Sequence, residues 1–527
     1  MPPTFHPEST HPPQHEPLPA SVVAAALPES EHEFYARDVY RQGASPRAVV
    51  RPRSRDELRT LVVDAARAGL ALIIRGGGAS YTDAHLPATT ASILIDTAAL
   101  NRVLSIDEQD MTVQVEPGVT WAALDAALAA RGLKVPFVGT FSGLAATVGG
   151  TLSQNANGHG SNAAGISADS VIAVEVLTPR GELLHTATAG SSAAPGLFRN
   201  HGPDLTGLFL GDAGALGIKT RIVLKLLRRK PVFEAASFAF ADFRSLHGCM
   251  SRLAAERLDD KSFGLDQALQ QGQIARQDAG TIWSIARSIW SSSPNATTAA
   301  TSLLRMAVAG TRGLAKAPYA AHYIVDGHQR LEARSKIATL RRIATGFGRE
   351  IANSVPTVVR ANPFQPLHNM LGPAGERWVP LHGLLPHSRV PAFHEELTSF
   401  VASHRTAMTR HHVHVGAMFS CIGASTFLYE PALYWQDQRT VFHERMMDPD
   451  YLARLPTYAA NPAGAELVET LRTGLIRLMH THGAAHFQIG KLYPYLDGRD
   501  TATLHLLRAI KQELDPDGRL NPGALGL

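Results

Sequence analysis

Three glycine-rich segments carry the residue types best suited to binding a ligand. The first, Arg75-Gly76-Gly77-Gly78-Ala79-Ser80, follows an apolar run. Consecutive glycines let the backbone turn tightly. Their free N–H groups form a concave site for an anion such as a pyrophosphate, and Ser80 can add a hydroxyl donor. Taken alone, this run also fits an ordinary tight turn.

The second segment spans residues 147–165 and the third spans 207–218. A long, polar, glycine-rich stretch inside an ordered domain is entropically unfavourable unless a ligand or tertiary contacts order it. Three such segments in one region are more specific than one alone. They do not form the G-x-G-x-x-G fingerprint, because Gly76–Gly78 opens no helix of a βαβ unit. A nicotinamide-type nucleotide fold is therefore disfavoured.

The elements around these segments alternate between helices and strands. Ser54-x-x-Glu57 is a capping box, followed by apolar residues at helical spacing as far as Gly69. A buried strand at 72–74 then leads into the first glycine run. The pattern predicts further strands at 93–95, 113–115, 171–177 and 218–226, with a helix at 120–131. Mixed strands and helices indicate an α+β unit as far as about residue 230.

A second region begins near Val232. Helices are expected at 242–257, 331–347 and 502–514, and strands at 322–325 and 351–354. This order predicts a sheet covered by helices on one face. Two apolar stretches, 282–290 and 303–317, fit either packed helices or an amphipathic helix at a membrane surface.

Composition narrows the classes of function. The net charge is +4, with no basic stretch interleaved with aromatics, so nucleic acid is a poor partner. Cys249 and Cys421 provide neither a disulfide scaffold nor a metal-binding pair, which fits a cytoplasmic location. No apolar run approaches the ~18 residues needed for a transmembrane segment. Residues 1–30 read as a flexible leader without a secretory signal.

The order of these motifs resembles the FAD-binding domain of the vanillyl-alcohol oxidase / p-cresol methylhydroxylase (PCMH) superfamily. The matching motifs lie at 52–54, 75–78, 115–119, 147–150 and 204–218, and residues 515–523 resemble that superfamily's C-terminal segment. The resemblance implies an α+β fold with a two-part FAD-binding PCMH-type domain at 40–230. It also implies an antiparallel-sheet cap domain for the substrate at 231–485, and a C-terminal helical return to the flavin at 486–527.

By position, the resemblance implies a set of cofactor-binding residues: Gly76, Gly77, Gly78, Ala79, Ser80, Pro117, Gly118, Thr140, Thr147, Gly149, Gly150, Gly158, Gly165, Ile218 and Asn521. Many relatives attach FAD covalently through a histidine at the position of Ala79, so dissociable FAD is expected here. The metal-binding segment of relatives that oxidise D-2-hydroxy acids is absent from the sequence. The sequence leaves open whether a metal site is formed by His411, His412 and His414 or whether these are ordinary histidines.

Flavin oxidation of an alcohol benefits from a base with a pKa near the working pH. The segment 486–493 resembles the active-site stretch of the alkyl-dihydroxyacetone-phosphate synthase branch. It suggests His486 as base or polariser, with Lys491 or Tyr493 as substrate anchor. Arg360 is a candidate clamp for a carboxylate, and His382 a candidate to face the flavin. The alternatives are a buried structural histidine, a solvated lysine and a surface arginine.

These residues predict an FAD-dependent oxidoreductase, an oxidase or dehydrogenase that takes a hydride from a small hydroxylated substrate such as a 2-hydroxy acid. Three alternatives stay open: a phenolic or benzylic alcohol oxidase, a non-redox enzyme of the alkyl-glycerone-phosphate synthase kind, and a non-catalytic flavin protein that docks through Trp283 and Trp290. Oxygen, a quinone or a cytochrome could reoxidise the flavin. The sequence leaves a homo-oligomer open.

Overall fold

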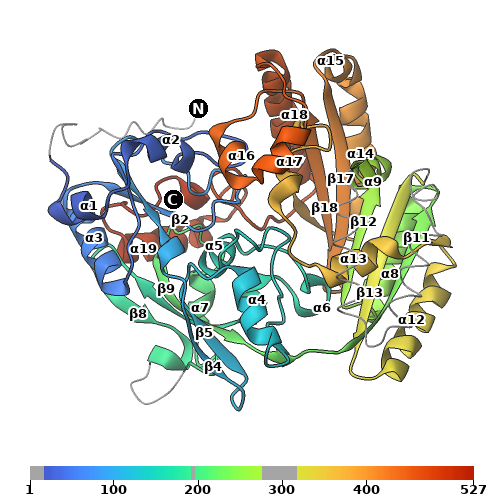
Figure 1. The fold of residues 1–527 in the computed structure, drawn as a ribbon, viewed down its shortest axis with the longest axis horizontal. Coiled ribbons are helices and arrows are strands. Elements are labelled where there is room, and N and C mark those ends of the chain that lie inside the picture. The colour runs from blue at the N-terminus through green and yellow to red at the C-terminus, as the bar shows by residue number, and fades with distance from the viewer. Residues whose placement is uncertain (1–16, 191–195, 276–316) are drawn as a thin grey trace.

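A computed structural model describes residues 17–190, 196–275 and 317–527. Both apolar stretches left open by the sequence, 282–290 and 303–317, lie outside the described residues except for Ala317. Figure 1 shows the N-terminal half beside a large sheet, with the C-terminal helix α19 (Thr501–Leu514) back against the N-terminal half. Among the described helices, none combines the length and the apolar character needed to cross a bilayer.

The first glycine run follows a small parallel sheet in the order β1-β3-β2, with strands Ala48–Val50 (β1), Ala71–Arg75 (β2) and Ser92–Asp96 (β3). Helix α3 (Arg55–Arg67) connects β1 to β2 and begins as the capping box predicts, because the Ser54 side chain accepts a hydrogen bond from the Glu57 N–H. Its apolar stripe packs into the core shared with these strands. The predicted helix and both predicted strands are therefore present.

A second, antiparallel sheet completes the N-terminal half in the order β4-β5-β9-β7-β8. Its strands are Val103–Asp107 (β4), Thr112–Val115 (β5), Val171–Leu177 (β7), Leu183–His185 (β8) and Ile218–Lys225 (β9). Helices α4 (Trp121–Ala129) and α5 (Val148–Gln154) lie between β5 and β7 in the chain. The parallel and antiparallel sheets together give the two-part architecture that the resemblance implied.

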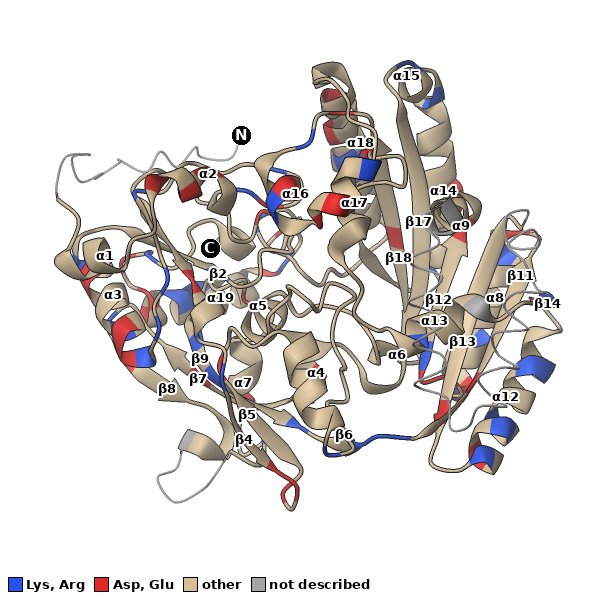
Figure 2. Cartoon of the chain, viewed as in Figure 1, with Lys and Arg blue, Asp and Glu red and all other residues tan. Residues whose placement is uncertain are grey.

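The large sheet is antiparallel, in the order β14-β11-β13-β12-β17-β18-β15, with β16 also paired to β18. Its strands are Val232–Phe240 (β11), Lys261–Asp266 (β12), Tyr319–Gly327 (β13), Arg349–Ile351 (β14), Arg377–Pro380 (β15), Gly383–Pro386 (β16), Val413–Ile422 (β17) and Thr426–Trp435 (β18). Figure 2 shows few charges on β17 and β18 and many on the outer helix α12 (Arg330–Ala344).

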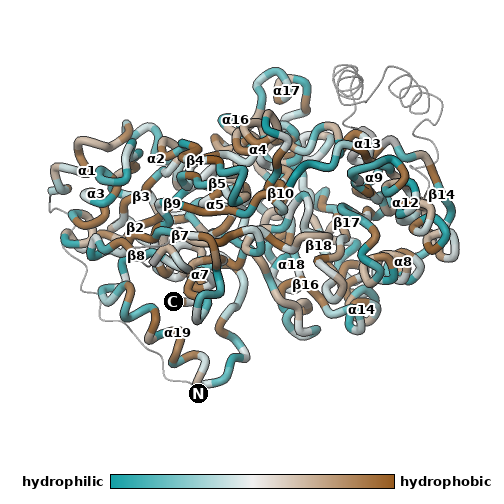
Figure 3. The backbone as a smooth tube through the Cα atoms, turned by 90° about the horizontal axis from the view of Figure 1, so that it is seen from below, coloured by the Kyte–Doolittle hydropathy of each residue, from teal (hydrophilic) through white to brown (hydrophobic). Residues whose placement is uncertain are grey.

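Helices cover one face of this sheet and form the largest core with it. They include α8 (Phe243–Glu256), α12, α14 (Val390–Ser403) and α18 (Pro462–Thr481). Figure 3 shows the apolar character of β7 and β9 in the N-terminal half, which has a separate core. The structure confirms the antiparallel sheet covered by helices that the sequence predicts for this region.

Two predictions need correction. Residues 20–25 form helix α1, whose Val22 is fully buried against α3, so this part of the expected leader is held in place by packing. The strand expected at 351–354 ends at Ile351, and Ser354 begins helix α13 (Ser354–Ala361), which packs on β11 and β13. The short apolar run there is compatible with either structure, and tertiary packing selects the helix.

The C-terminal segment adds itself to the edge of the small parallel sheet. The Leu72 N–H donates to the Arg519 carbonyl at 2.8 Å, and the Asn521 N–H donates to the Leu72 carbonyl at 3.0 Å. The Asp515 side chain accepts hydrogen bonds from the Arg519 and Leu520 N–H groups and fixes the turn before this pairing. The predicted C-terminal return therefore reaches the strand that precedes the first glycine run.

Candidate functional site

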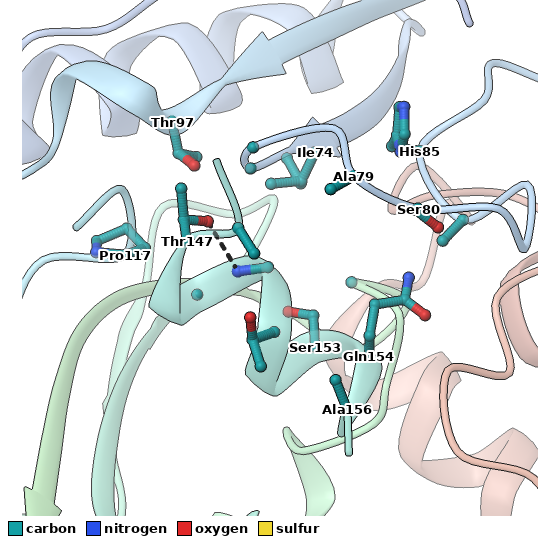
Figure 4. A pocket seen from close by; sticks show the side chains of 18 of the residues that line it. Ile74, Ala79, Ser80, His85, Thr97, Pro117, Thr147, Ser153, Gln154 and Ala156 are labelled. Carbon is teal, nitrogen blue, oxygen red and sulfur yellow. Dashed lines mark hydrogen bonds between the residues drawn. The ribbon is translucent and has the colours of Figure 1, made fainter. Parts of the chain in front are cut away.

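A cavity with an empty volume of about 900 Å³ lies in the N-terminal half. All three glycine segments contribute to its wall, as Figure 4 shows in part. The predicted cofactor-binding residues that line it are Gly76, Gly77, Gly78, Ala79, Ser80, Pro117, Thr140, Thr147, Gly149, Gly150 and Ile218.

The first glycine loop offers a row of free backbone donors. The N–H groups of residues 76–80 donate no hydrogen bond to any described residue. The buried Arg75 guanidinium lies against Gly78, and its charge is stabilised by the rings of Phe34 and Tyr35, at 4.9 and 4.6 Å from its Cζ. Free amides and a buried cation behind them make this loop suited to an anionic group.

The glycines allow the loops to approach one another more closely than loops with any other residue at these positions could. A Cβ on Gly77 would lie 1.8 Å from the Ala145 carbonyl oxygen, and one on Gly149 would lie 2.5 Å from Pro117 Cβ. The Thr147 side chain accepts a hydrogen bond from the Gly150 N–H at 3.3 Å and begins α5 beside the first loop (Figure 4). The loops therefore form a narrow slot lined largely by backbone.

Polar side chains that the sequence interpretation missed also line the cavity. Lys219 Nζ donates to Asp212 Oδ1 at 2.7 Å and to Ser153 Oγ at 2.9 Å, and burial raises the pKa of Asp212. Burial, with the positive charge of Arg75, lowers the pKa of His85 to about 3, so this ring is neutral. The signal available for Lys219 was a lysine directly after the third glycine segment, which ends at Ile218.

Four predicted cofactor residues are not part of the cavity wall: Gly118, Gly158, Gly165 and Asn521. Gly118 packs against the backbone of residues 97–100, where its N–H donates to the Leu100 carbonyl at 2.7 Å. Asn521 Nδ2 donates to the carbonyls of Ala84 and Ala213, at 2.7 and 2.6 Å, and both of these residues do line the cavity. Asn521 therefore supports the wall from behind.

Gly158 and Gly165 instead flank a link between the two halves of the chain. Between them, the Asn162 side chain donates to Ser420 Oγ at 3.2 Å and accepts from the Ser262 N–H at 3.0 Å. Both serines belong to the large sheet. The glycines permit the turns of this link, with φ of +81° at Gly165.

At the end of the cavity marked by Gln488, a second cluster joins three predicted catalytic residues. The Tyr493 hydroxyl accepts a hydrogen bond from the His382 N–H at 2.9 Å. The His486 Nδ1 lies 2.7 Å from the His382 carbonyl, and the His486 ring stacks on Tyr493 with centroids 3.9 Å apart. The structure therefore brings His382, His486 and Tyr493 together.

Both histidines of this cluster are neutral near pH 7. Burial, followed by the charge of His486, lowers the pKa of His382 to about 3, and burial lowers that of His486 to about 4. His382 Nε2 hydrogen-bonds to the Phe487 carbonyl, so this nitrogen carries the proton. The other nitrogen, Nδ1, lies 3.5 Å from the Tyr493 hydroxyl.

Tyr81 connects the cluster to the cavity. Its phenol lies near the side chain of Gln488, which lines the cavity and lowers the pKa of Tyr81 against the larger effect of burial. Its ring lies 6.2 Å from that of His382 and 5.9 Å from that of Trp378, both edge to face. A molecule held among these aromatic side chains would therefore lie beside whatever fills the cavity.

The other two predicted catalytic residues lie elsewhere. Lys491 Nζ donates to the Leu86 carbonyl at 2.6 Å, which places it behind the cavity wall, and burial lowers its pKa to about 8. Arg360 Nε donates to Asp326 Oδ1 at 2.9 Å, on β13. The cluster therefore does not include Arg360, because the carboxylate of Asp326 holds it.

The histidines at 411–414 show no metal-binding arrangement. His414 stacks on Tyr434 with centroids 4.8 Å apart. The described part of the chain contains no group of three or more His, Cys, Asp or Glu side chains placed to hold a metal ion.

Comparisons with known proteins agree with the cavity's chemistry. Residues 46–187 match the family model described as an FAD binding domain. An uncharacterised FAD-linked oxidoreductase of Mycobacterium tuberculosis is 28% identical over 240 residues, 45% of this chain and 49% of that protein. The glycolate oxidase subunit GlcD of Bacillus subtilis is 31% identical over 213 residues, 39% of this chain and 44% of that protein. The chain thus matches less than half the length of either relative.

The fold is also similar to a solved structure of p-cresol methylhydroxylase with substrate bound. The TM-score is 0.70 at 14% identity, and the match covers 95% of this chain and 94% of that one. Five free amides, a backbone-lined slot and a buried cation fit the pyrophosphate of FAD. Residues 76–80 would hold that group, with Thr147, Gly149 and Gly150 on the facing wall.

Proposed function

We propose that this protein is an FAD-dependent oxidoreductase of the PCMH-type superfamily that acts on a small hydroxylated substrate, since residues 46–187 match the family model of an FAD binding domain. The observation that carries the proposal is the contact between the cavity and the cluster of His382, His486 and Tyr493, made through Gln488 and Tyr81. FAD, when bound, supplies the acceptor for the two electrons that leave the substrate carbon.

The residues of the cluster have separate tasks in this proposal. Neutral His486 offers a hydrogen-bonding nitrogen to the substrate hydroxyl, while Tyr493 fixes the backbone of His382. Tyr81 and Trp378 form an aromatic wall that positions the substrate body and excludes water. We retain the division into residues 40–230, 231–485 and 486–527 as part of this proposal, since the large sheet begins at Val232.

Within this class, the geometry favours a phenolic or benzylic alcohol over a 2-hydroxy acid. A 2-hydroxy acid needs a cation for its carboxylate, and the candidate clamp Arg360 is paired with Asp326 away from the cluster. The rings of Tyr81, Trp378 and Tyr493 instead suit an aromatic substrate. We further propose a reducing, cytoplasmic location, in keeping with the two free and buried cysteines.

Anaerobic reduction of the bound flavin tests the proposal. The FAD-loaded protein is mixed with D-lactate, glycolate and 4-hydroxybenzyl alcohol in turn, and loss of the yellow absorbance is followed. We expect bleaching by 4-hydroxybenzyl alcohol and slower bleaching in the variant His486→Asn. The matched control is His505→Asn, an exposed histidine of α19.

Purified protein that takes up no FAD would overturn the proposal. FAD uptake without bleaching by any member of the panel would favour the non-redox alternative or a flavin-binding protein without catalysis. Bleaching by D-lactate alone would return the assignment to 2-hydroxy acids.

A further inference from the structure

One acidic residue lies within strand β18 on the side away from the helix-packed core. Tyr429, Leu433 and Trp435 alternate into that core, so Glu430 projects from the opposite face of the sheet, where its strand partner is Met418. Glu430 is the only charged residue of β18. A lone carboxyl on a sheet face needs a physical reason to be there.

No bond compensates the charge of Glu430, which is half-buried. Its carboxyl has no hydrogen-bond or ion-pair partner among the described residues. Burial raises its pKa to about 7. The carboxyl is therefore divided between its protonated and ionised forms near neutral pH.

The groups that face Glu430 belong to the cluster already described. Burial and then the charge of Glu430 raise the pKa of Tyr81, and Glu430 also acts on the phenol of Tyr493. His382 and His486 complete the titratable groups of this cluster, and the guanidinium of Arg472 lies behind Tyr81, whose carbonyl accepts its hydrogen bond at 3.0 Å. The backbone supports this placement, because the carbonyl of Pro431, the residue after Glu430, accepts the N–H of Leu381, the residue before His382, at 2.8 Å.

We propose that Glu430 is the catalytic base that takes the proton from the substrate hydroxyl, an inference that rests on the proposed oxidation. The O–H bond of the substrate breaks and its proton passes to a carboxylate oxygen of Glu430. The released electron pair forms the carbonyl π bond, and the hydrogen on the adjacent carbon leaves with its electron pair for oxidised FAD. The substrate carbon is oxidised by two electrons and the flavin is reduced by two.

The alternative bases in the cluster are less suited to this step. His382 has its Nε2 bonded to the Phe487 carbonyl and its backbone N–H bonded to Tyr493. His486 and His382 both have pKa values far below neutrality. A base is most effective when its pKa lies near the working pH, a condition that Glu430 meets.

The experiment compares Glu430→Gln, Glu430→Asp and Asp266→Asn with the wild-type protein, all loaded with FAD. Asp266 is a matched control, because it is a buried carboxyl on the helix-packed face of the same sheet, where its Oδ2 accepts the Ala417 N–H. Flavin reduction by 4-hydroxybenzyl alcohol is measured in single turnovers from pH 5.5 to 9. Infrared difference spectra follow the carboxylic-acid carbonyl band over the same range without substrate.

We expect wild-type reduction to rise with pH through about 7, since the ionised form is the active one. Glu430→Gln should be about 10²–10⁴-fold slower with this rise abolished, Glu430→Asp should regain part of the rate, and Asp266→Asn should behave as wild type. An infrared band that titrates near neutrality in wild type should be absent from Glu430→Gln.

Wild-type rates in Glu430→Gln, or no titrating band, would overturn the role of Glu430 while leaving the proposed oxidation intact. Wild-type protein that 4-hydroxybenzyl alcohol fails to reduce would overturn the aromatic-alcohol assignment and this inference with it. FAD absorbance of each variant, recorded before mixing, separates a loss of chemistry from a loss of cofactor.

Discussion

The Tyr493 hydroxyl accepts a hydrogen bond from the backbone N–H of His382 at 2.9 Å, across 111 residues of sequence. The same His382 peptide region receives His486 through its carbonyl, at 2.7 Å. Hydrogen bonds to main-chain groups of His382 therefore position the C-terminal segment against the large sheet. This contact sets the orientation of both histidines in the cluster.

Replacing Tyr493 with Phe leaves the buried His382 N–H without an acceptor. We expect the free energy of unfolding to fall by about 1–3 kcal/mol, the cost of an unsatisfied buried polar group. Urea titration of the two proteins measures the difference. Tyr458→Phe is the control, because the hydroxyl of that half-buried tyrosine bonds to the Ala374 carbonyl near the surface, and its loss should change stability by less than about 0.5 kcal/mol. Equal effects of the two substitutions would contradict the role given to Tyr493.

Gly150→Ala tests whether cofactor fills the slot between the first two glycine segments. The new Cβ would lie 3.6 Å from Gly76 Cα, an ordinary contact, and 3.1 Å from Thr147 Oγ1, which would have to shift by a few tenths of an ångström. Alanine also favours helix α5 by up to about 1 kcal/mol over glycine. We expect the stability of the FAD-free protein to be kept or increased, and FAD to bind at least about tenfold more weakly, roughly 1.4 kcal/mol.

Fluorescence titration with FAD and thermal unfolding of the FAD-free protein give the two quantities. Gly346→Ala, after helix α12 and remote from the cavity, serves as the comparison. Wild-type affinity in Gly150→Ala would show that the cofactor does not approach this wall.

Ala79 lines the cavity where a histidine would serve for covalent attachment, and its methyl group cannot form such a bond. We expect FAD to separate from the polypeptide on denaturation. Heat or acid precipitation followed by absorbance of the supernatant measures the released flavin. Yellow colour remaining in the washed precipitate would mean that another side chain makes a covalent link.

The stability of the protein should depend on Lys491 above neutral pH. Burial lowers the pKa of Lys491 to about 8 in the folded chain, below the 10.5 of a free lysine. Between these values the unfolded chain binds more protons at this residue, so its contribution to stability grows as pH rises and is lost as pH falls through about 8. The free energy of unfolding of wild type minus that of Lys491→Met should increase from pH 8 to 10. A difference that stays flat would show that Lys491 is not buried in this way.

Much of the N-terminal half could be predicted because its signals are local. The Ser54 cap, the alternation of β5 and β9 and the glycine runs depend on residues within a few positions of one another. The free amides of residues 76–80 follow from the same local sequence. The boundary near residue 351 shows the limit of this approach, since packing on β11 and β13 replaced an expected strand with α13.

The sequence by itself determined the glycine-rich, backbone-lined segments suited to an anionic ligand and their order along the chain, because glycine conformation and strand–turn patterns are properties of short segments. Only the tertiary structure decided which distant side chains share the space beyond it. It brought His382, His486 and Tyr493 together. It also paired Arg360 with Asp326 and placed Glu430 near Tyr81. Strand register and sheet packing control which distant side chains come into contact. A shift of one residue along β18 would turn Glu430 into the core.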